Sequence, residues 1–192
     1  MNHVFLFQVH KEPELLDRIL TRLDSTNHFY AVNIDKKCNC ISEMTNVLKK
    51  HNKVIDISMD NVMHGGFSFT DCTIRQMKRL LDNREYHFDY YHTLSGQDYP
   101  CVSNNILDSW FEVNNGTSYC MMDSPEQAKE WRKGKYKLRL KRWYWSDVFN
   151  TQFAIKLHLG RIMTRLTSTT APCVCERGFF VFKKTKGGVT ID

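Results

Sequence analysis

The first half of the chain alternates short apolar runs with segments in which apolar residues recur at helical spacing. Strands are predicted at residues 4–9, 29–34, 53–57 and 86–94, and helices at residues 13–23, 42–50 and 70–81. Strands that are separated by helices usually pair in parallel and are joined by right-handed crossovers. We therefore expect an α/β fold, built as a doubly wound and mostly parallel sheet.

The bulk composition is that of a soluble globular protein. Of the 192 residues, 42% are hydrophobic and 25% are charged, which argues against general disorder. No apolar run approaches the roughly 20 residues of a spanning helix, and the run at residues 4–9 lacks the basic flank of a signal peptide. We therefore expect a cytoplasmic chain.

The net charge of +6 fits several anionic partners, including a nucleotide diphosphate, an anionic membrane surface and nucleic acid.

The common motifs for metals, dinucleotides and phosphates are absent from the sequence. No Asp-x-Asp pair is present to hold a divalent cation beside a diphosphate, so neither a metal nor a cofactor is expected. The lack of a dinucleotide-binding glycine loop and of a lysine-type phosphate loop argues against dehydrogenases, kinases and ATPases. Cys-x-Cys pairs at 38–40 and 173–175 could supply thiolates to zinc, but their spacing is unusual for such sites. The seven cysteines are expected to be reduced thiols.

Polar residues at the predicted strand ends form the candidate site. The run Leu94–Pro100 places Ser95 and Asp98 where open α/β sheets bind ligands, although glycine, aspartate and proline also mark ordinary turns. Asp35 ends the second predicted strand and could accept hydrogen bonds from a ribose hydroxyl or a base N–H, or could cap a turn. Gly65-Gly66 permits either close backbone approach to a ligand or a simple turn.

Four histidines fall near the predicted strands. His10 and His64 lie in loops where a ligand would bind. His87 and His92 lie in or beside a strand and are expected to be core or rim residues.

The later part of the chain has a less regular pattern. Ser103 is a predicted N-cap for a helix through Phe111, and residues 148–166 have the apolar spacing of another helix. The segment 131–145 interleaves basic with aromatic residues. It fits a solvated strand face beside packed aromatics or a peripheral contact with an anionic membrane, and we expect no nucleic-acid partner. The basic tail at 183–192 has no core signal and is expected to be loose.

Four motifs, taken in order, resemble one protein family. They are His10-Lys11 with Leu15-Leu16-Asp17-Arg18, then residues 30–37, then Gly65-Gly66-Phe67-Ser68, and finally Leu94–Pro100. From residue 4 to about residue 145, the chain is similar to the core-2 and I-branching β-1,6-N-acetylglucosaminyltransferases and their xylosyltransferase relatives. The resemblance implies a nucleotide-sugar glycosyltransferase fold of the GT-A-like type, inverting sugar transfer and no metal requirement.

The resemblance also implies roles for individual residues. The implied donor- and nucleotide-binding residues are Gln8, Val9, His10, Asp35, His64, Gly65, Ser95 and Asp98. His64 stands where the family more usually has Tyr or Trp, and an imidazole could still stack on a base. Arg132 and Lys135 fall where basic residues would touch the acceptor sugar. The implied partners are a uridine diphosphate (UDP) sugar as donor and a glycan or lipid-linked glycan as acceptor.

The catalytic part of the family is not found in these residues. Family members continue through a Gly-Ser-x-Trp segment to an acidic pair whose Glu is the catalytic base, a context that Glu176 does not match. Inverting transfer needs such a carboxylate, and positive charge to stabilise the leaving diphosphate. We therefore expect one domain at 1–182, truncated at its carboxyl end, with a donor-binding part (1–112), an acceptor-side part (113–182) and weak or absent activity. The alternative is a non-catalytic remnant that binds a nucleotide sugar or a glycan.

Overall fold

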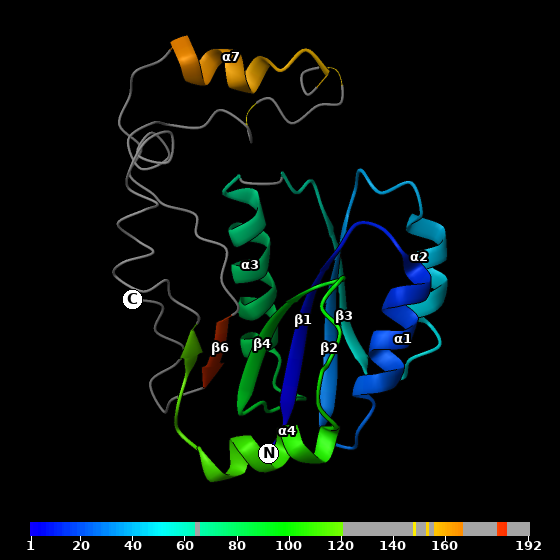
Figure 1. Ribbon diagram of the computed structural model, residues 1–192, viewed down its shortest axis with the longest axis vertical. Helices are drawn as coiled ribbons and strands as arrows, with labels where there is room; N and C mark the ends of the chain where they lie inside the picture. The colour runs from blue at the N-terminus through cyan, green and yellow to red at the C-terminus, as the bar shows by residue number, and fades with distance from the viewer. Residues whose placement is uncertain (64–65, 121–147, 149–152, 154–155, 167–179, 184–192) are drawn as a thin grey trace. The chain divides into compact units, whose positions relative to one another are not determined.

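The computed structural model describes residues 1–63, 66–120, 148, 153, 156–166 and 180–183 (Figure 1). The chain divides into two compact units, which are described separately. The first unit comprises Met1–Asp60, Cys72–Cys120 and Phe179–Asp192, and the second comprises Asn61–Asp71 and Met121–Gly178. The expected boundary between a donor-binding and an acceptor-side part, at residue 112, stays a prediction.

A mostly parallel sheet forms the centre of the first unit. Its strands among the described residues are β1 (His3–Val9), β2 (His28–Asp35), β3 (Val54–Asp60), β4 (Tyr90–Ser95), β5 (Tyr119–Cys120) and β6 (Phe180–Lys183). They follow the order β3-β2-β1-β4-β6-β5, in which the first four strands are parallel and β6 and β5 are added antiparallel. The predicted α/β sheet is confirmed.

Helices cover both faces of this sheet (Figure 1). They are α1 (Pro13–Leu23) and α2 (Ile41–Leu48) on one face and α3 (Ser68–Asp82) on the other, while α4 (Asn104–Val113) lies across the amino-terminal ends of the strands. The side chains of β1 alternate between two cores, so that Phe5 and Phe7 pack with α1 and α2 while Val4 and Leu6 pack with α3. All seven residues of β1 are buried, as expected for a parallel strand that is covered on both sides.

The predicted helix starts are confirmed at two positions. Pro13 is the first residue of α1, where its fixed φ suits the helix and its missing N–H costs no hydrogen bond. Ser103 is the N-cap of α4, and its hydroxyl accepts a hydrogen bond from the backbone N–H of Ile106.

The expected bounds of two strands are wrong. The strand predicted at 86–94 begins only at Tyr90, because pairing with β1 starts at the His3–Tyr90 register. Before that point, Tyr86 and Phe88 use their apolar rings to pack against Phe29, and the pattern mistakes this packing for a strand. The third strand, predicted to end at residue 57, continues to residue 60.

Two expectations for the second half of the chain are corrected, one for the helix at 148–166 and one for the start of the tail at residue 183. The helix predicted over 148–166 is interrupted, because Leu157 and His158 form a turn in which His158 has a φ of 52°. The helix α7 (Leu159–Leu166) follows that turn. Residue Lys183, expected in a loose tail, is the last residue of β6. The basic and aromatic segment 131–145 lies outside the described residues, among which no helix is long and apolar enough to span a membrane.

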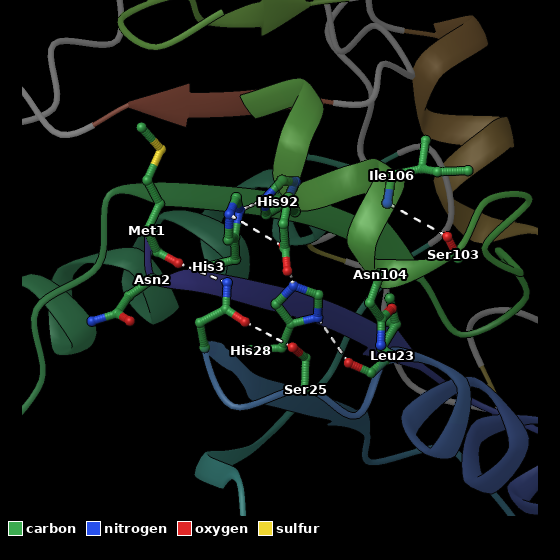
Figure 2. A network of polar contacts seen from close by, with 12 residues as sticks. Met1, Asn2, His3, Leu23, Ser25, His28, His92, Ser103, Asn104 and Ile106 are labelled. Atoms are coloured by element: carbon green, nitrogen blue, oxygen red, sulfur yellow. Dashed lines mark hydrogen bonds and ion pairs between the residues drawn. The ribbon is translucent and has the colours of Figure 1, made fainter. Parts of the chain in front are cut away.

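Three buried histidines meet at the amino-terminal edge of the sheet, where α4 packs across it (Figure 2). His3 Nδ1 lies 2.9 Å from His92 Nε2, and His28 Nε2 lies 2.7 Å from the carboxylate of Asp108 on α4. Burial, and next the nearby His28, lower the pKa of His3 to about 4. The pKa of His92 is lowered well below its usual value by burial and then by His3 and His28. Of the two histidines expected to be core or rim residues, His92 is buried as expected, whereas His87 is exposed.

Candidate functional site

The order of the strands creates a switch point between β1 and β4. The chain adds β2 and then β3 on one side of β1, and crosses with α3 to place β4 on the other side. Open α/β sheets bind ligands beyond the carboxyl ends of the strands at such a point. Gln8 of β1 is in register with Ser95 of β4 and with Asn33 of β2, so the candidate residues from three strands meet at one edge (Figure 1).

The loop after β4 is a closed turn built by two of the candidate residues. The carboxylate of Asp98 accepts a hydrogen bond from the backbone N–H of Ser95 at 2.6 Å, and Asp98 N–H donates to the Ser95 carbonyl at 3.1 Å. The Ser95 hydroxyl accepts from the N–H of Gln97. Ser95 and Asp98 therefore give this loop its shape, and a contact with a ligand would come in addition to that role.

Gly96 lies directly against β1. Its N–H donates to the carbonyl of Gln8 at 2.9 Å, and a Cβ on Gly96 would stand 2.8 Å from Cγ1 of Val9. Val9 is itself buried and stiff about χ1, so it has little freedom to move away. The close packing explains why a glycine stands here.

We expect Gly96→Ala to destabilise the protein because of this contact. Overpacking costs roughly 1 to 3 kcal/mol, and a single methyl group should fall at the lower end. Urea unfolding measures the loss. Val9→Ala supplies the matched background, in which Gly96→Ala should cost much less. If Gly96→Ala lowers the free energy of unfolding equally in both backgrounds, Val9 is not the residue that the added methyl group overpacks.

Asp35 is half-buried at the end of β2 and holds the start of the following loop. Its Oδ1 accepts a hydrogen bond from Lys37 N–H at 3.1 Å and forms an ion pair with Lys37 Nζ at 3.0 Å. Its carbonyl accepts from Cys38 N–H at 2.8 Å. The turn-capping role left open by the sequence is therefore present, and the same carboxylate lies at the ligand-binding edge of the sheet.

The loop after β1 carries a strained residue that sequence patterns do not reveal. Val9 is buried, so only its backbone could reach a ligand, while His10 is exposed just beyond the strand. Glu12 follows with a φ of 59°, a left-handed conformation that costs a non-glycine residue roughly 1 to 3 kcal/mol. Such strain is often found where a loop must present groups in a fixed geometry.

A buried polar network beneath α3 was missed by the sequence prediction. The Gln8 side chain points into the protein, where its Oε1 lies 2.8 Å from the Asn33 amide and its Nε2 lies 3.4 Å from Gln76 Oε1. Ser58 Oγ lies 2.9 Å from Asn33 as well. The signal was available, because Gln8 and Asn33 are polar residues near the ends of otherwise apolar strands. Gln8 thus lies at the predicted edge with its side chain held in this network.

The other predicted site residues lie outside the described residues. These are His64, Gly65, Arg132 and Lys135. Their roles stay predictions.

Comparison with known proteins decides the family. A family model described as Core-2/I-Branching enzyme matches residues 4–160. The chain belongs to the Core-2/I-Branching enzyme family. Membership confirms the resemblance seen in the four motifs, and the parallel sheet is consistent with a GT-A-like fold for this domain.

Curated relatives of this Core-2/I-Branching family member include xylosyltransferases. Xylosyltransferase 2 of Rattus norvegicus is 26% identical over 106 residues, which are 54% of this chain and 12% of the relative. Xylosyltransferase 1 of Rattus norvegicus is 24% identical over 141 residues, or 67% of this chain and 16% of the relative. Xylosyltransferase 1 of Homo sapiens is 21% identical over 132 residues, which are 67% of this chain and 14% of the relative. The matches thus span less than a fifth of each relative.

Proposed function

We propose that this chain carries the donor-binding part of a glycosyltransferase that moves a sugar from a UDP-sugar to a glycan hydroxyl. One observation carries the proposal: Val9-His10, Asp35 and Ser95–Asp98 lie at the carboxyl ends of β1, β2 and β4, beside the switch point. Family membership and the transferase names of the relatives support the same conclusion.

The residues at this edge suit a nucleotide diphosphate. Asp35 would accept hydrogen bonds from the ribose or the uracil N–H, and the Ser95–Asp98 turn would form the floor of the donor site. Lys11 and Lys36 bring positive charge to an anionic ligand. Direct inverting transfer without a metal or cofactor is part of the proposal, and the transferred sugar is N-acetylglucosamine or xylose.

A non-catalytic binding protein is the second candidate function. It is favoured by one observation, which is that both carboxylates of the candidate site, Asp35 and Asp98, accept hydrogen bonds within their own turns. Neither is assigned as the base that takes the acceptor proton.

Calorimetry with UDP, paired with an assay for UDP release from UDP-xylose and UDP-N-acetylglucosamine, tests both candidates. Binding together with release supports the transferase, and binding without release supports the non-catalytic protein. Absence of UDP binding contradicts both. UMP is the matched control ligand, because a site for the diphosphate should bind UMP more weakly.

A peripheral membrane contact through residues 131–145 is also proposed. The basic residues would bind anionic headgroups, and the attraction should weaken with salt. We expect the chain to pellet with phosphatidylserine vesicles at low salt and to remain in solution at high salt. Failure to pellet at low salt would remove the membrane contact from the proposal.

A further inference from the structure

Two thiols face each other in the loop that joins β2 to α2. The Sγ atoms of Cys38 and Cys40 lie 2.9 Å apart, and both residues are partly exposed. A disulfide bond length of about 2.05 Å would require the sulfurs to approach by only about 0.9 Å. Both side chains also pack against the core formed by α1 and α2, which restricts how far they can separate. The pair is thus held in a position to react.

The two thiols are chemically different. Burial, and next the hydrogen bond with Cys38, raise the pKa of Cys40 to about 11, so Cys40 keeps its proton. The backbone N–H of Cys40 donates to Cys38 Sγ at 3.2 Å, and the proton on Cys40 Sγ can be shared with the same atom. Because Cys38 Sγ receives both donors while Cys40 keeps its proton, Cys38 is assigned as the nucleophile of the pair.

We propose that Cys38 and Cys40 form a reversible dithiol–disulfide site that is oxidised by glutathione disulfide. The Cys38 thiolate attacks one sulfur of glutathione disulfide, which forms a mixed disulfide and releases one glutathione thiolate. Cys40 then loses its proton and attacks the Cys38 sulfur, which expels the second glutathione. The dithiol gives up two electrons and two protons, and both glutathione molecules leave as thiols.

Oxidation of Cys38 and Cys40 weakens ligand binding at the candidate donor site. This part of the inference rests on the proposed function. The Cys38 N–H donates to the carbonyl of Asp35, and Lys37 between them binds the Asp35 carboxylate through both its N–H and its Nζ. Closing a bond between Cys38 and Cys40 moves the backbone at Cys38 and so shifts Asp35 and Lys37. The oxidised form is expected to bind UDP at least about 5-fold more weakly, the lower end of ordinary coupling between sites.

Mass spectrometry of tryptic peptides after incubation in glutathione buffers tests the thiol chemistry without any ligand. Cleavage after Lys37 and Lys49 leaves both cysteines in one peptide, so the disulfide appears as the loss of two hydrogen atoms from that peptide. In Cys40→Ser we expect glutathione to accumulate on Cys38, and in Cys38→Ser no internal disulfide forms. Cys101→Ser, which removes an exposed thiol elsewhere, should leave the reaction unchanged. A peptide that stays reduced in glutathione disulfide would overturn the proposal.

Calorimetry with UDP on the reduced and oxidised forms then separates the two claims. Weaker binding after oxidation, reversed by dithiothreitol and absent in Cys38→Ser, supports the coupling. Equal binding of UDP by both forms overturns the coupling. If neither form binds UDP although the disulfide forms, the proposed function fails while the redox site stands.

Discussion

Lowering the pH from about 7 to about 5 is expected to reduce the free energy of unfolding by at least about 2 kcal/mol. The reason is the buried cluster of His3, His28 and His92, in which His3 Nε2 lies 3.7 Å from the Asp108 carboxylate and has no hydrogen-bond partner among the described residues. A charged ring at His3 or His92 would be desolvated and would face other histidines. The charged amino terminus also disfavours a protonated His3, whereas the carboxylates of Asp108 and Asp89 favour it. Burial has the largest effect, so the pKa of His3 is lowered overall.

The direction follows from proton binding. His3 titrates near 6.5 in the unfolded chain and near 4 in the folded one, so the unfolded chain binds more protons between these values. Stability is therefore fully present above pH 6.5 and is lost as the pH falls toward 4. His3 alone accounts for about 2 kcal/mol between pH 7 and 5, and the lowered pKa of His92 acts in the same direction.

Urea unfolding at several pH values measures this loss. His92→Gln removes one titrating ring from the cluster and should reduce the slope by up to about 1.4 kcal/mol per pH unit. His87→Gln is the matched control, because His87 is exposed beside the same strand and should not contribute. A free energy of unfolding that stays constant from pH 7 to 5 would contradict the assigned burial of the cluster.

Asp35→Asn is expected to weaken UDP binding roughly 10- to 100-fold. A hydrogen bond to a charged group contributes about 1.5 to 3 kcal/mol, which corresponds to this range of affinity. The asparagine keeps the shape of the side chain and can still accept the Lys37 N–H, so the β2 turn should survive. The experiment compares dissociation constants from calorimetry for the two proteins.

The control for this change is Asp82→Asn. Asp82 is an exposed acidic residue at the end of α3, so the variant removes the same charge without changing the candidate site. Its affinity for UDP should equal that of the unchanged protein. If both variants lose affinity equally, the loss is not particular to position 35, and Asp35 has no specific contact with the nucleotide.

The sequence predicts the parallel part of the fold because hydrophobic burial leaves a regular pattern there. In β1 both faces are covered, and in α1 the residues Leu16, Ile19 and Leu20 recur at helical spacing, so either element can be recognised from its own residues. The antiparallel addition of β6 escapes such reasoning, because its pairing depends on residues far away along the chain. The prediction that β4 begins at residue 86 is wrong, because aromatic packing and strand pairing use the same residue types.

The candidate site is only partly readable from the sequence. Asp35, Ser95 and Asp98 could be found because polar residues follow apolar strands at a place where ligands bind. The same reasoning places Gln8 at the site but does not show that its amide points toward Asn33 and Gln76. The strain at Glu12 and the 2.9 Å approach of Cys38 to Cys40 depend on backbone geometry, which no spacing rule records.

An NMR titration shows whether the carboxyl ends of β1, β2 and β4 bind a nucleotide diphosphate, as we propose. UDP is added to ¹⁵N-labelled protein and the backbone amide shifts are followed. We expect saturable changes at Val9-His10, at Asp35 and at Ser95–Asp98, with none at the opposite edge around His28 and Tyr90. Shifts at that opposite edge alone, or no saturable shifts at all, would contradict the proposal.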